Sequence, residues 1–166
     1  LDNLVEWYFD VFKIRPQAHS QRQIGSGQRP GNGNHAVSEI GDLALMATNR
    51  QGLRVIDVSD PKNPREIGHH EVAGYTYGVA VAPGFAYIAA GSLGLRVVDI
   101  SDPTAPVEIG AIDTPGFAFD VVVADRFAYV ADSSSGLQVV DISDPAAPVL
   151  VGMCPTDFAF SLVVSD

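Results

Sequence analysis

The chain has 166 residues and a formal net charge of −10, with 46% hydrophobic and 18% charged residues. This length fits one domain with a sizeable core, and the composition argues against wholesale disorder. The charge is uneven, because residues 71–166 contain only two basic residues, Arg96 and Arg126, against twelve acidic ones. Such a surface repels phosphate backbones and anionic lipid headgroups, so we expect no nucleic acid or membrane-surface partner. No apolar run approaches the roughly 20 residues that a membrane-spanning helix needs, so we expect no transmembrane span.

Residues 1–34 form an atypical N-terminal segment. Residues 22–25 resemble residues 65–68, so we interpret residues 1–25 as the degenerate end of a preceding repeat unit. Residues 26–34 are rich in Gly and Asn and are expected to form a loop. The segment also contains an aromatic cluster that is a candidate docking surface for a larger assembly: Trp7, Tyr8, Phe9 and Phe12.

A 42-residue period begins after this segment. Residues 52–61 read Gly-Leu-Arg-Val-Ile-Asp-Val-Ser-Asp-Pro, and close copies return at residues 94–103 and 136–145. Self-similarity at a fixed spacing of this length is typical of a repeat architecture.

The middle copy divides into four short strand candidates, at residues 77–82, 85–90, 95–100 and 107–112. Val, Ile, Tyr and Phe dominate these runs, and Gly, Pro, Asp and Ser separate them. Four consecutive strands with short links make an antiparallel meander. A meander repeated every 40–45 residues or so is typical of a β-propeller blade.

The other copies align with the middle one. Residues 35–40 and 43–47 correspond to its first two strands, residues 149–153 supply a fourth strand, and residues 160–164 begin a new unit. The sequence therefore predicts an all-β propeller domain over residues 35–166, built from ~42-residue four-stranded antiparallel blades. It contains three full blades, with partial blades at both ends.

Two arrangements of these ends remain open. The blades belong to a longer ring, or the N-terminal outer strands and the C-terminal inner strand complete one blade, within one chain or between two. An open end leaves a strand edge and an apolar blade face in water, which favours self-association or assembly into a larger complex.

The repeated units, such as Leu-Arg-Val-Val-Asp-Ile-Ser-Asp-Pro at 95–103 and Phe-Ala-Tyr-Val-Ala-Asp at 127–132, resemble the LVIVD repeat. That family forms β-propellers in bacterial and archaeal proteins that are often exported or surface-attached. The resemblance implies a propeller and an extracytoplasmic setting, either periplasmic or at the cell surface. The family has no common set of catalytic residues to carry over to this chain, and we expect no cofactor.

The repeated acidic residues favour a structural interpretation. An Asp before Pro accepts backbone N–H bonds and starts a turn, so Asp60, Asp102 and Asp144 are expected to shape turns. The adjacent His69 and His70 point to opposite faces of a strand and do not form a chelating pair. We therefore predict no metal site. The single cysteine, Cys154, has apolar neighbours and is expected to be buried.

Aromatic residues recur in the loops that lead into the innermost strands. In a meander, these loops and the loops between the second and third strands lie on one side of the blade, near the mouth of the central channel. One interpretation is a set of core side chains between blades. The other is a recognition surface, since aromatics supply large contact areas. The candidate residues of this channel-mouth surface are Tyr75, Tyr77, Phe117, Phe119, Asp120, Asp132, Phe158 and Phe160.

These patterns favour a non-catalytic scaffold that binds a protein partner. One alternative is an enzyme or small-ligand-binding propeller with its site at the channel mouth, around Asp120 and Asp132. A second alternative is a structural subunit that docks on a larger complex through its N-terminal segment.

Overall fold

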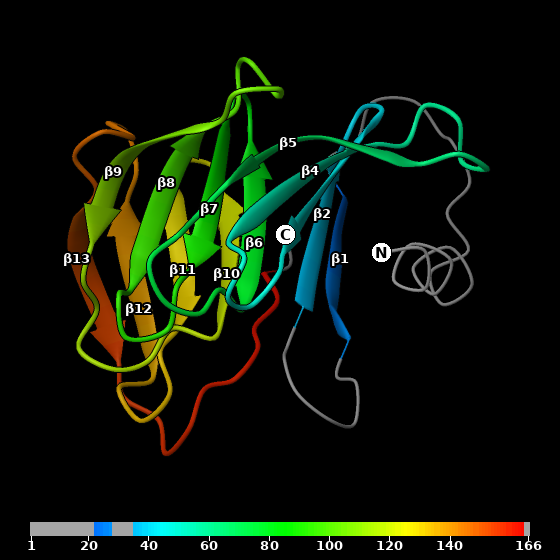
Figure 1. The fold of residues 1–166 in the computed structure, drawn as a ribbon. Helices are drawn as coiled ribbons and strands as arrows, with labels where there is room; N and C mark the ends of the chain where they lie inside the picture. Colours follow the sequence, from blue (N-terminus) through cyan, green and yellow to red (C-terminus); the bar gives the residue numbers. More distant parts are fainter. Residues whose placement is uncertain (1–21, 28–34, 165–166) are drawn as a thin grey trace.

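The computed structural model describes residues 22–27 and 35–164, and the regular structure in this part of the chain is entirely β (Figure 1). Its strands form three antiparallel sheets. The first sheet contains β1 (Arg22–Gly27), β2 (His35–Ile40), β3 (Leu43–Ala47), β4 (Leu53–Asp57) and β5 (Arg65–His70). The second contains β6 (Gly78–Ala82), β7 (Phe85–Ala89), β8 (Leu95–Asp99) and β9 (Val107–Ile112). The third contains β10 (Asp120–Ala124), β11 (Phe127–Ala131), β12 (Leu137–Asp141) and β13 (Val149–Cys154).

Each 42-residue copy folds into one four-stranded meander, as predicted. In the second sheet every strand pairs with the next one along the chain, in the order β6-β7-β8-β9, and the third sheet repeats this order. The last pair of strands carries a register shift in each copy, at Val55/Ile56, Val97/Val98 and Val139/Val140. The repeated sequence therefore specifies the same pairing and the same irregularity three times.

The sheets stack like blades, and the core lies between them. The innermost strands β2, β6 and β10 lie next to one another, β2 against β6 and β6 against β10 (Figure 1). Successive strand residues point to opposite faces, and the consecutive Tyr87 and Ile88 of β7 are both buried. Ile88 packs in the cluster between the first and second sheets, and Tyr87 packs in the cluster between the second and third. The central sheet is therefore covered on both faces, which explains its nearly continuous apolar runs.

A glycine in the fourth strand allows each blade to fit closely against the next. A Cβ on Gly68 would lie 2.2 Å from the carbonyl oxygen of Pro103, in the β8–β9 turn of the second blade. A Cβ on Gly110 would lie 2.2 Å from the carbonyl oxygen of Pro145, in the β12–β13 turn of the third blade. The turn between the third and fourth strands of one blade thus packs directly against the fourth-strand glycine of the blade before it. A side chain at this glycine would have no room.

The structure differs from the sequence prediction at both ends. The prediction assigns residues 1–25 to a preceding blade, whereas β1 pairs with β2 and adds a fifth strand to the first sheet. The free edge of β2 offers unpaired backbone groups, and β1 satisfies them. Residues 1–21, including Trp7, Tyr8, Phe9 and Phe12, lie outside the described residues.

Residues 160–164, predicted to be a strand, are not part of a sheet, because no strand of the described residues lies beside them to pair. They are held instead by contacts described below. Among the described residues, no helix is long and apolar enough to cross a membrane.

Candidate functional site

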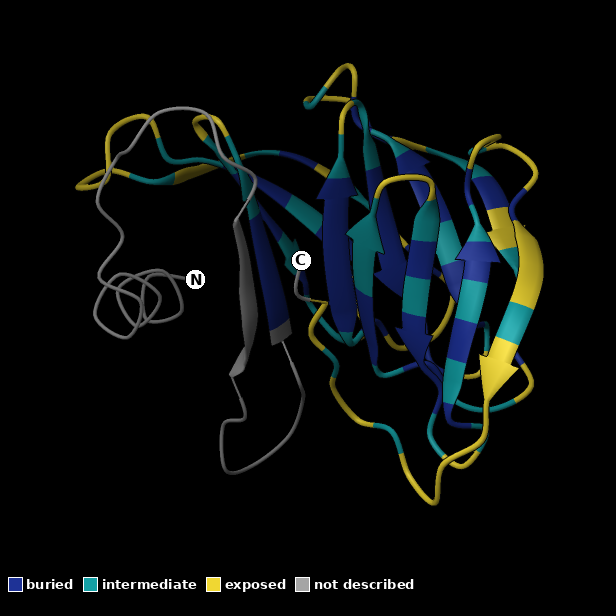
Figure 2. Ribbon diagram, turned by 180° about the vertical axis from the view of Figure 1, so that it is seen from behind, coloured by how far each residue is buried: buried dark blue, intermediate teal, exposed yellow. Residues whose placement is uncertain are grey.

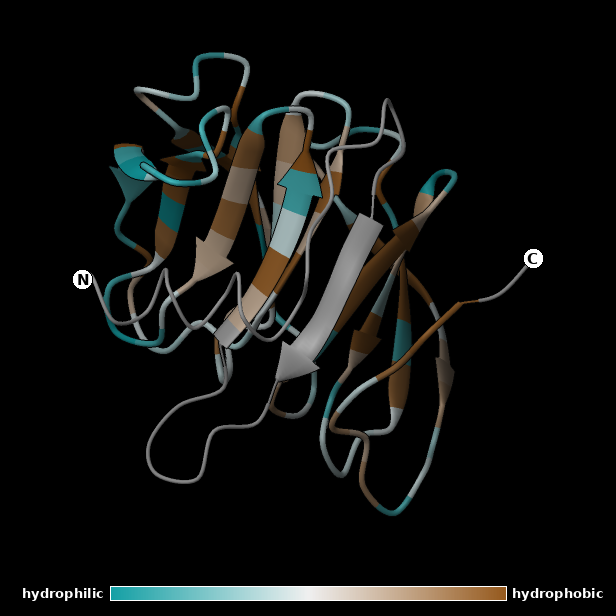
Figure 3. Ribbon diagram, turned by 90° about the vertical axis from the view of Figure 1, so that its right-hand side faces the viewer, coloured by the Kyte–Doolittle hydropathy of each residue, from teal (hydrophilic) through white to brown (hydrophobic). Residues whose placement is uncertain are grey.

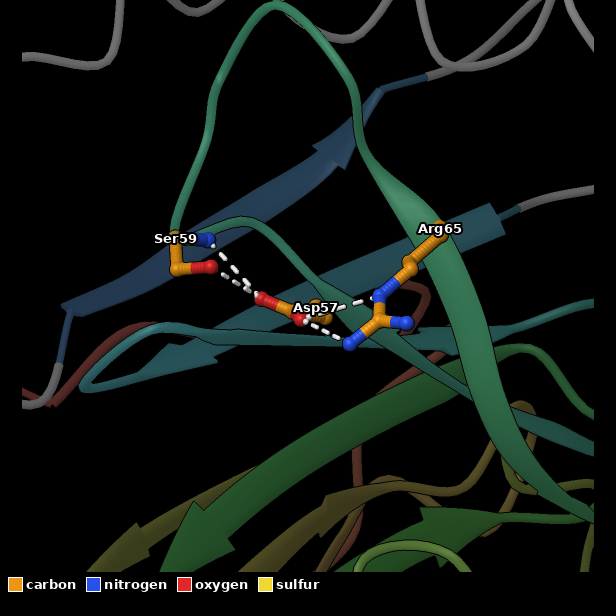
Figure 4. Close-up of polar contacts among 3 residues, drawn as sticks. All are labelled: Asp57, Ser59 and Arg65. Atoms are coloured by element: carbon orange, nitrogen blue, oxygen red, sulfur yellow. Dashed lines mark hydrogen bonds and ion pairs between the residues drawn. The ribbon is translucent and has the colours of Figure 1, made fainter.

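The strictly repeated Asp and Ser residues at and just after the end of the third strand of each blade form hydrogen bonds within turns. In the first blade, the carboxylate of Asp57 accepts hydrogen bonds from the Ser59 backbone N–H (3.0 Å) and the Ser59 hydroxyl (2.6 Å), and from Arg65 (3.2 Å) (Figure 4). The Ser59 bonds, with the hydroxyl first, hold the pKa of this carboxyl below its usual value. Asp99 and Asp141 make the same pair of bonds to Ser101 and Ser143.

The aspartates before proline also act within their own turns. Asp60, Asp102 and Asp144 each accept the backbone N–H two residues further on, at 3.0–3.1 Å. This confirms the structural interpretation of the Ser-Asp-Pro motif. Each of these carboxylates accepts a donor of its own turn, which is the structural role that the sequence predicts for it.

The six aromatic candidates form one continuous array across the second and third blades and the residues that follow. The link between the blades runs through Tyr77, whose ring centroid lies 5.2 Å from that of Phe117 and 5.3 Å from that of Phe119. Phe119 then contacts Phe160 at 5.0 Å, and Phe160 stacks on Phe158 at 5.8 Å with an interplanar angle of 5°. At the other end, Tyr75 lies 6.3 Å from Tyr77.

Backbone bridges place this array on the side of the blades that the sequence predicts. Asn49 bridges to Thr76, Gly91 to Ala118 and Ser133 to Ala159. Each bridge joins the loop between the second and third strands of one blade to the chain that enters the next blade. The two kinds of loop therefore lie together, as expected for the mouth of a propeller channel.

The array is partly open to solvent. Phe158 is 65% exposed and Phe160 is 52% exposed, while Tyr77, Phe117 and Phe119 are half-buried. The two interpretations of the aromatics therefore apply to different parts of the array. The inner rings pack between blades, and the outer rings present an apolar surface.

Two neighbours of the array are not among the predicted site residues. The guanidinium of Arg50 donates hydrogen bonds to the Tyr75 hydroxyl, one of them 3.0 Å long, and its carbon lies 5.0 Å from the ring centroid. Gly91, with a φ of 57°, makes room for the Phe117 ring, whose nearest carbon would lie 2.7 Å from a Cβ. Both residues lie in loops between the second and third strands, which the sequence places at the channel mouth, but nothing in the sequence indicated their contacts with Tyr75 and Phe117.

Asp120 is an internal link between strands. It is 4% exposed, and its carboxylate accepts the Ser161 hydroxyl (2.8 Å), the Leu162 N–H (3.2 Å) and the Val121 N–H (2.9 Å). Burial raises its pKa, against the opposing effect of these three donors. Asp120 thus fastens residues 161–162 to the innermost strand of the third blade.

Asp132 is also engaged inside the protein. It is fully buried and accepts the Thr114 hydroxyl (2.6 Å) and the Gly116 N–H (2.8 Å). These bonds hold the linker that carries Phe117. Asp120 and Asp132 therefore position the aromatic array and do not project from it.

The remaining polar candidates do not converge. His69 Nδ1 lies 3.5 Å from Glu66 and His70 Nε2 lies 3.7 Å from Glu108, so the two histidines face different carboxylates. Within the described residues, no group of three or more His, Cys, Asp or Glu side chains could hold a metal ion. Cys154, expected to be buried, is exposed, because no sheet of the described chain covers its face of the third blade.

Stacked four-stranded meanders that repeat every 42 residues are the blades of a β-propeller. The LVIVD repeat model matches residues 35–71, 73–114 and 115–156, which is more than half of the chain. The chain belongs to the LVIVD-repeat family. No curated protein matches the sequence.

Proposed function

We propose that this protein is a non-catalytic propeller scaffold that binds a partner protein through the aromatic array at the channel mouth. The observation that carries the proposal is the continuous run of rings across the second and third blades, whose outer members Tyr75, Phe158 and Phe160 are exposed. Exposed aromatic side chains supply large contact areas with few rotatable bonds, and they are enriched among residues that dominate binding energy.

The charge distribution supports a partner with a basic surface. The region that carries the array, residues 71–166, has two basic residues against twelve acidic ones. Complementary charge speeds association and fixes orientation more than it adds affinity. We propose an apolar contact centred on the rings, with the net negative charge of this region attracting a cationic partner. We also propose an extracytoplasmic location, in line with the setting that the family resemblance implies.

The geometry of the two buried carboxylates does not favour a catalytic site at the same mouth. Asp120 and Asp132 are buried and bonded to internal donors, so neither offers a free oxygen to a substrate. The alternative of a structural subunit depends on the N-terminal segment, whose aromatic cluster lies outside the described residues.

A displayed library of random peptides, selected on the immobilised protein, tests the proposal. We expect selected peptides to be rich in basic and apolar residues. Their Kd should rise about tenfold when Phe158 is replaced by Ala, since a residue at the centre of a contact contributes more than about 1 kcal/mol. Val107→Ala is the matched control, because Val107 is 57% exposed on the outer strand β9, outside the array.

Two results would contradict the proposal. Equal loss of binding in Phe158→Ala and Val107→Ala would mean that the array is not the contact. A metabolite that raises the Tm of the protein, with the shift lost in Asp120→Ala, would favour the ligand-binding alternative.

A further inference from the structure

Arg50 differs from the other arginines whose side chains the structure describes, because it pairs with no carboxylate. Arg54, Arg65, Arg96 and Arg126 each lie 2.9–3.6 Å from a carboxylate oxygen. Arg50 makes no such pair with any described residue, although the chain carries a net charge of −10. Its positive charge is therefore not neutralised within the described part of the chain.

Tyr75 holds the guanidinium of Arg50 at one end of the aromatic array. Nε and Nη2 both donate to the Tyr75 hydroxyl, and the Nε bond is 3.0 Å long. The guanidinium carbon lies 5.0 Å from the ring centroid. These two bonds use one edge of the guanidinium. The edge formed by Nη1 and Nη2 has no acceptor among the described residues, and a guanidinium edge of this kind binds a carboxylate through two parallel hydrogen bonds.

Solvent reaches this end of the array. Arg50 is exposed and lies in the loop between β3 and β4, which the bridge from Asn49 to Thr76 fixes beside the entry to the second blade. Figure 2 shows exposed residues mainly in the loops and on β13, and Figure 3 shows that the strands are largely hydrophobic. Tyr75 is 38% exposed. A ligand can therefore approach the free guanidinium edge and the Tyr75 ring from the same loop region.

The other end of the array carries the opposite charge. Asp157 directly precedes Phe158 in the chain and is exposed. The equivalent positions before Tyr75 and Phe117 are glycines. The run of rings thus extends from a cation beside Tyr75 to an acidic residue beside Phe158. Charges of opposite sign at the two ends of a contact fix the orientation of a partner more than they add affinity.

We propose, on the basis of the function proposed above, that Arg50 binds a carboxylate side chain of the partner and so sets the direction in which the partner lies along the array. The partner segment then places an Asp or Glu on the free guanidinium edge and apolar side chains on the rings. A basic side chain of the same segment lies beside Asp157. The partner is basic overall but has an acidic residue at one fixed place.

Two small probes test the carboxylate site directly. 3-Phenylpropionate and 3-phenyl-1-propanol share a ring and a three-carbon chain, and they differ in the carboxylate. NMR titration of the full chain, followed at the Tyr75 ring signals, gives a Kd for each probe. The net charge of −10 repels anions, so a general charge effect would favour the alcohol. We expect 3-phenylpropionate to bind about fivefold more tightly, as for a well-formed ion pair at an exposed site.

Arg50→Gln should abolish this preference, so that the two probes bind equally. Arg126→Gln is the matched control. Arg126 is also exposed, and its guanidinium carbon lies 4.9 Å from the ring centroid of Phe127, but it already pairs with Asp141. Its replacement removes the same charge from the protein and should leave the preference for 3-phenylpropionate intact.

A peptide selected on the protein then tests the direction of binding. Each acidic residue of the peptide is replaced in turn by its amide. One replacement should raise the Kd about fivefold for the wild-type protein and leave it unchanged for Arg50→Gln.

The proposed function and the role of Arg50 fail in different ways. Peptide binding that is weakened by Phe158→Ala but not by Arg50→Gln would overturn the role of Arg50 and leave the array as the contact. Tighter binding of the alcohol to wild type, or equal loss of the preference in Arg50→Gln and Arg126→Gln, would also overturn it. The titration needs no selected peptide, so it tests Arg50 even where the library yields none.

Discussion

The glycine in the fourth strand of each blade gives the sharpest prediction about how the blades hold together. In Gly110→Ala, the new Cβ would lie 2.2 Å from the Pro145 carbonyl oxygen and 3.1 Å from two atoms of Ala146. A normal contact needs at least about 3.4 Å, so the turn of the third blade has to move away by about 1 Å. Forcing extra volume into a packed contact costs about 1–3 kcal/mol.

Gly152→Ala is the matched control for this substitution. Both glycines lie in equivalent strands, and both replacements reduce the entropy of the unfolded chain by the same amount, about 0.4–1 kcal/mol in favour of folding. The Cβ on Gly152 meets only Val139, at 3.7 Å, so no clash opposes that gain. The difference in unfolding free energy between the two variants therefore isolates the contact between blades.

Thermal unfolding followed by circular dichroism measures this difference. For a chain of this size, each 1 kcal/mol lowers the Tm by about 2–4 °C. The entropy gain offsets part of the packing cost, so we expect Gly110→Ala to unfold about 3–5 °C below wild type, and Gly152→Ala at or slightly above it. Equal Tm values for the two variants would refute the inference that the turn of one blade rests on the glycine of another.

The two buried carboxylates give the remaining predictions. Because the pKa of Asp120 is raised by burial, the folded state holds its proton more tightly than the unfolded chain, and its contribution to stability falls as pH rises above 3.8 toward the raised value. Asn does not titrate, so Asp120→Asn does not lose stability in this way. The Tm of the variant minus the Tm of wild type should therefore increase as the pH rises from 3.8 toward the raised pKa. A difference that does not change with pH would contradict a raised pKa for Asp120. Asp132→Ala leaves the buried donors of Thr114 and Gly116 without a partner, at a cost of about 1–3 kcal/mol. Hydrogen exchange of the Gly116 amide should then accelerate at least tenfold, and unchanged exchange would show that Asp132 does not hold the linker.

The sequence was sufficient to predict the blades because local signals agree there. The predicted strand at residues 95–100 differs from β8 by one residue, since Gly94 and the Ser-Asp-Pro turn mark its ends. The grouping of the aromatic residues was also predicted, because a meander places its alternate loops on one side.

Contacts between blades were harder to predict. Asp120 was a candidate site residue in the sequence, but its hydrogen bond to Ser161 depends on how neighbouring strands approach. The role of Gly110 under Pro145 depends on the same approach. The prediction for Cys154 was wrong because apolar neighbours in sequence do not show which face of a blade is covered.

The N-terminal strand shows a further limit. A four-residue likeness suggested the outer strand of another blade, whereas β1 pairs with the inner strand β2. A strand sequence specifies its alternation between faces, but it does not specify the edge on which the strand pairs.

Hydrogen exchange measured with and without a selected peptide tests the central claim most directly, namely that the strict motif builds the blades and the aromatic array binds the partner. We predict that the peptide slows exchange in residues 115–119 and 155–161, which carry Phe117, Phe158 and Phe160. Exchange in the repeated Ser-Asp-Pro turns should stay unchanged. Protection of those turns, with the aromatic segments unaffected, would contradict the account.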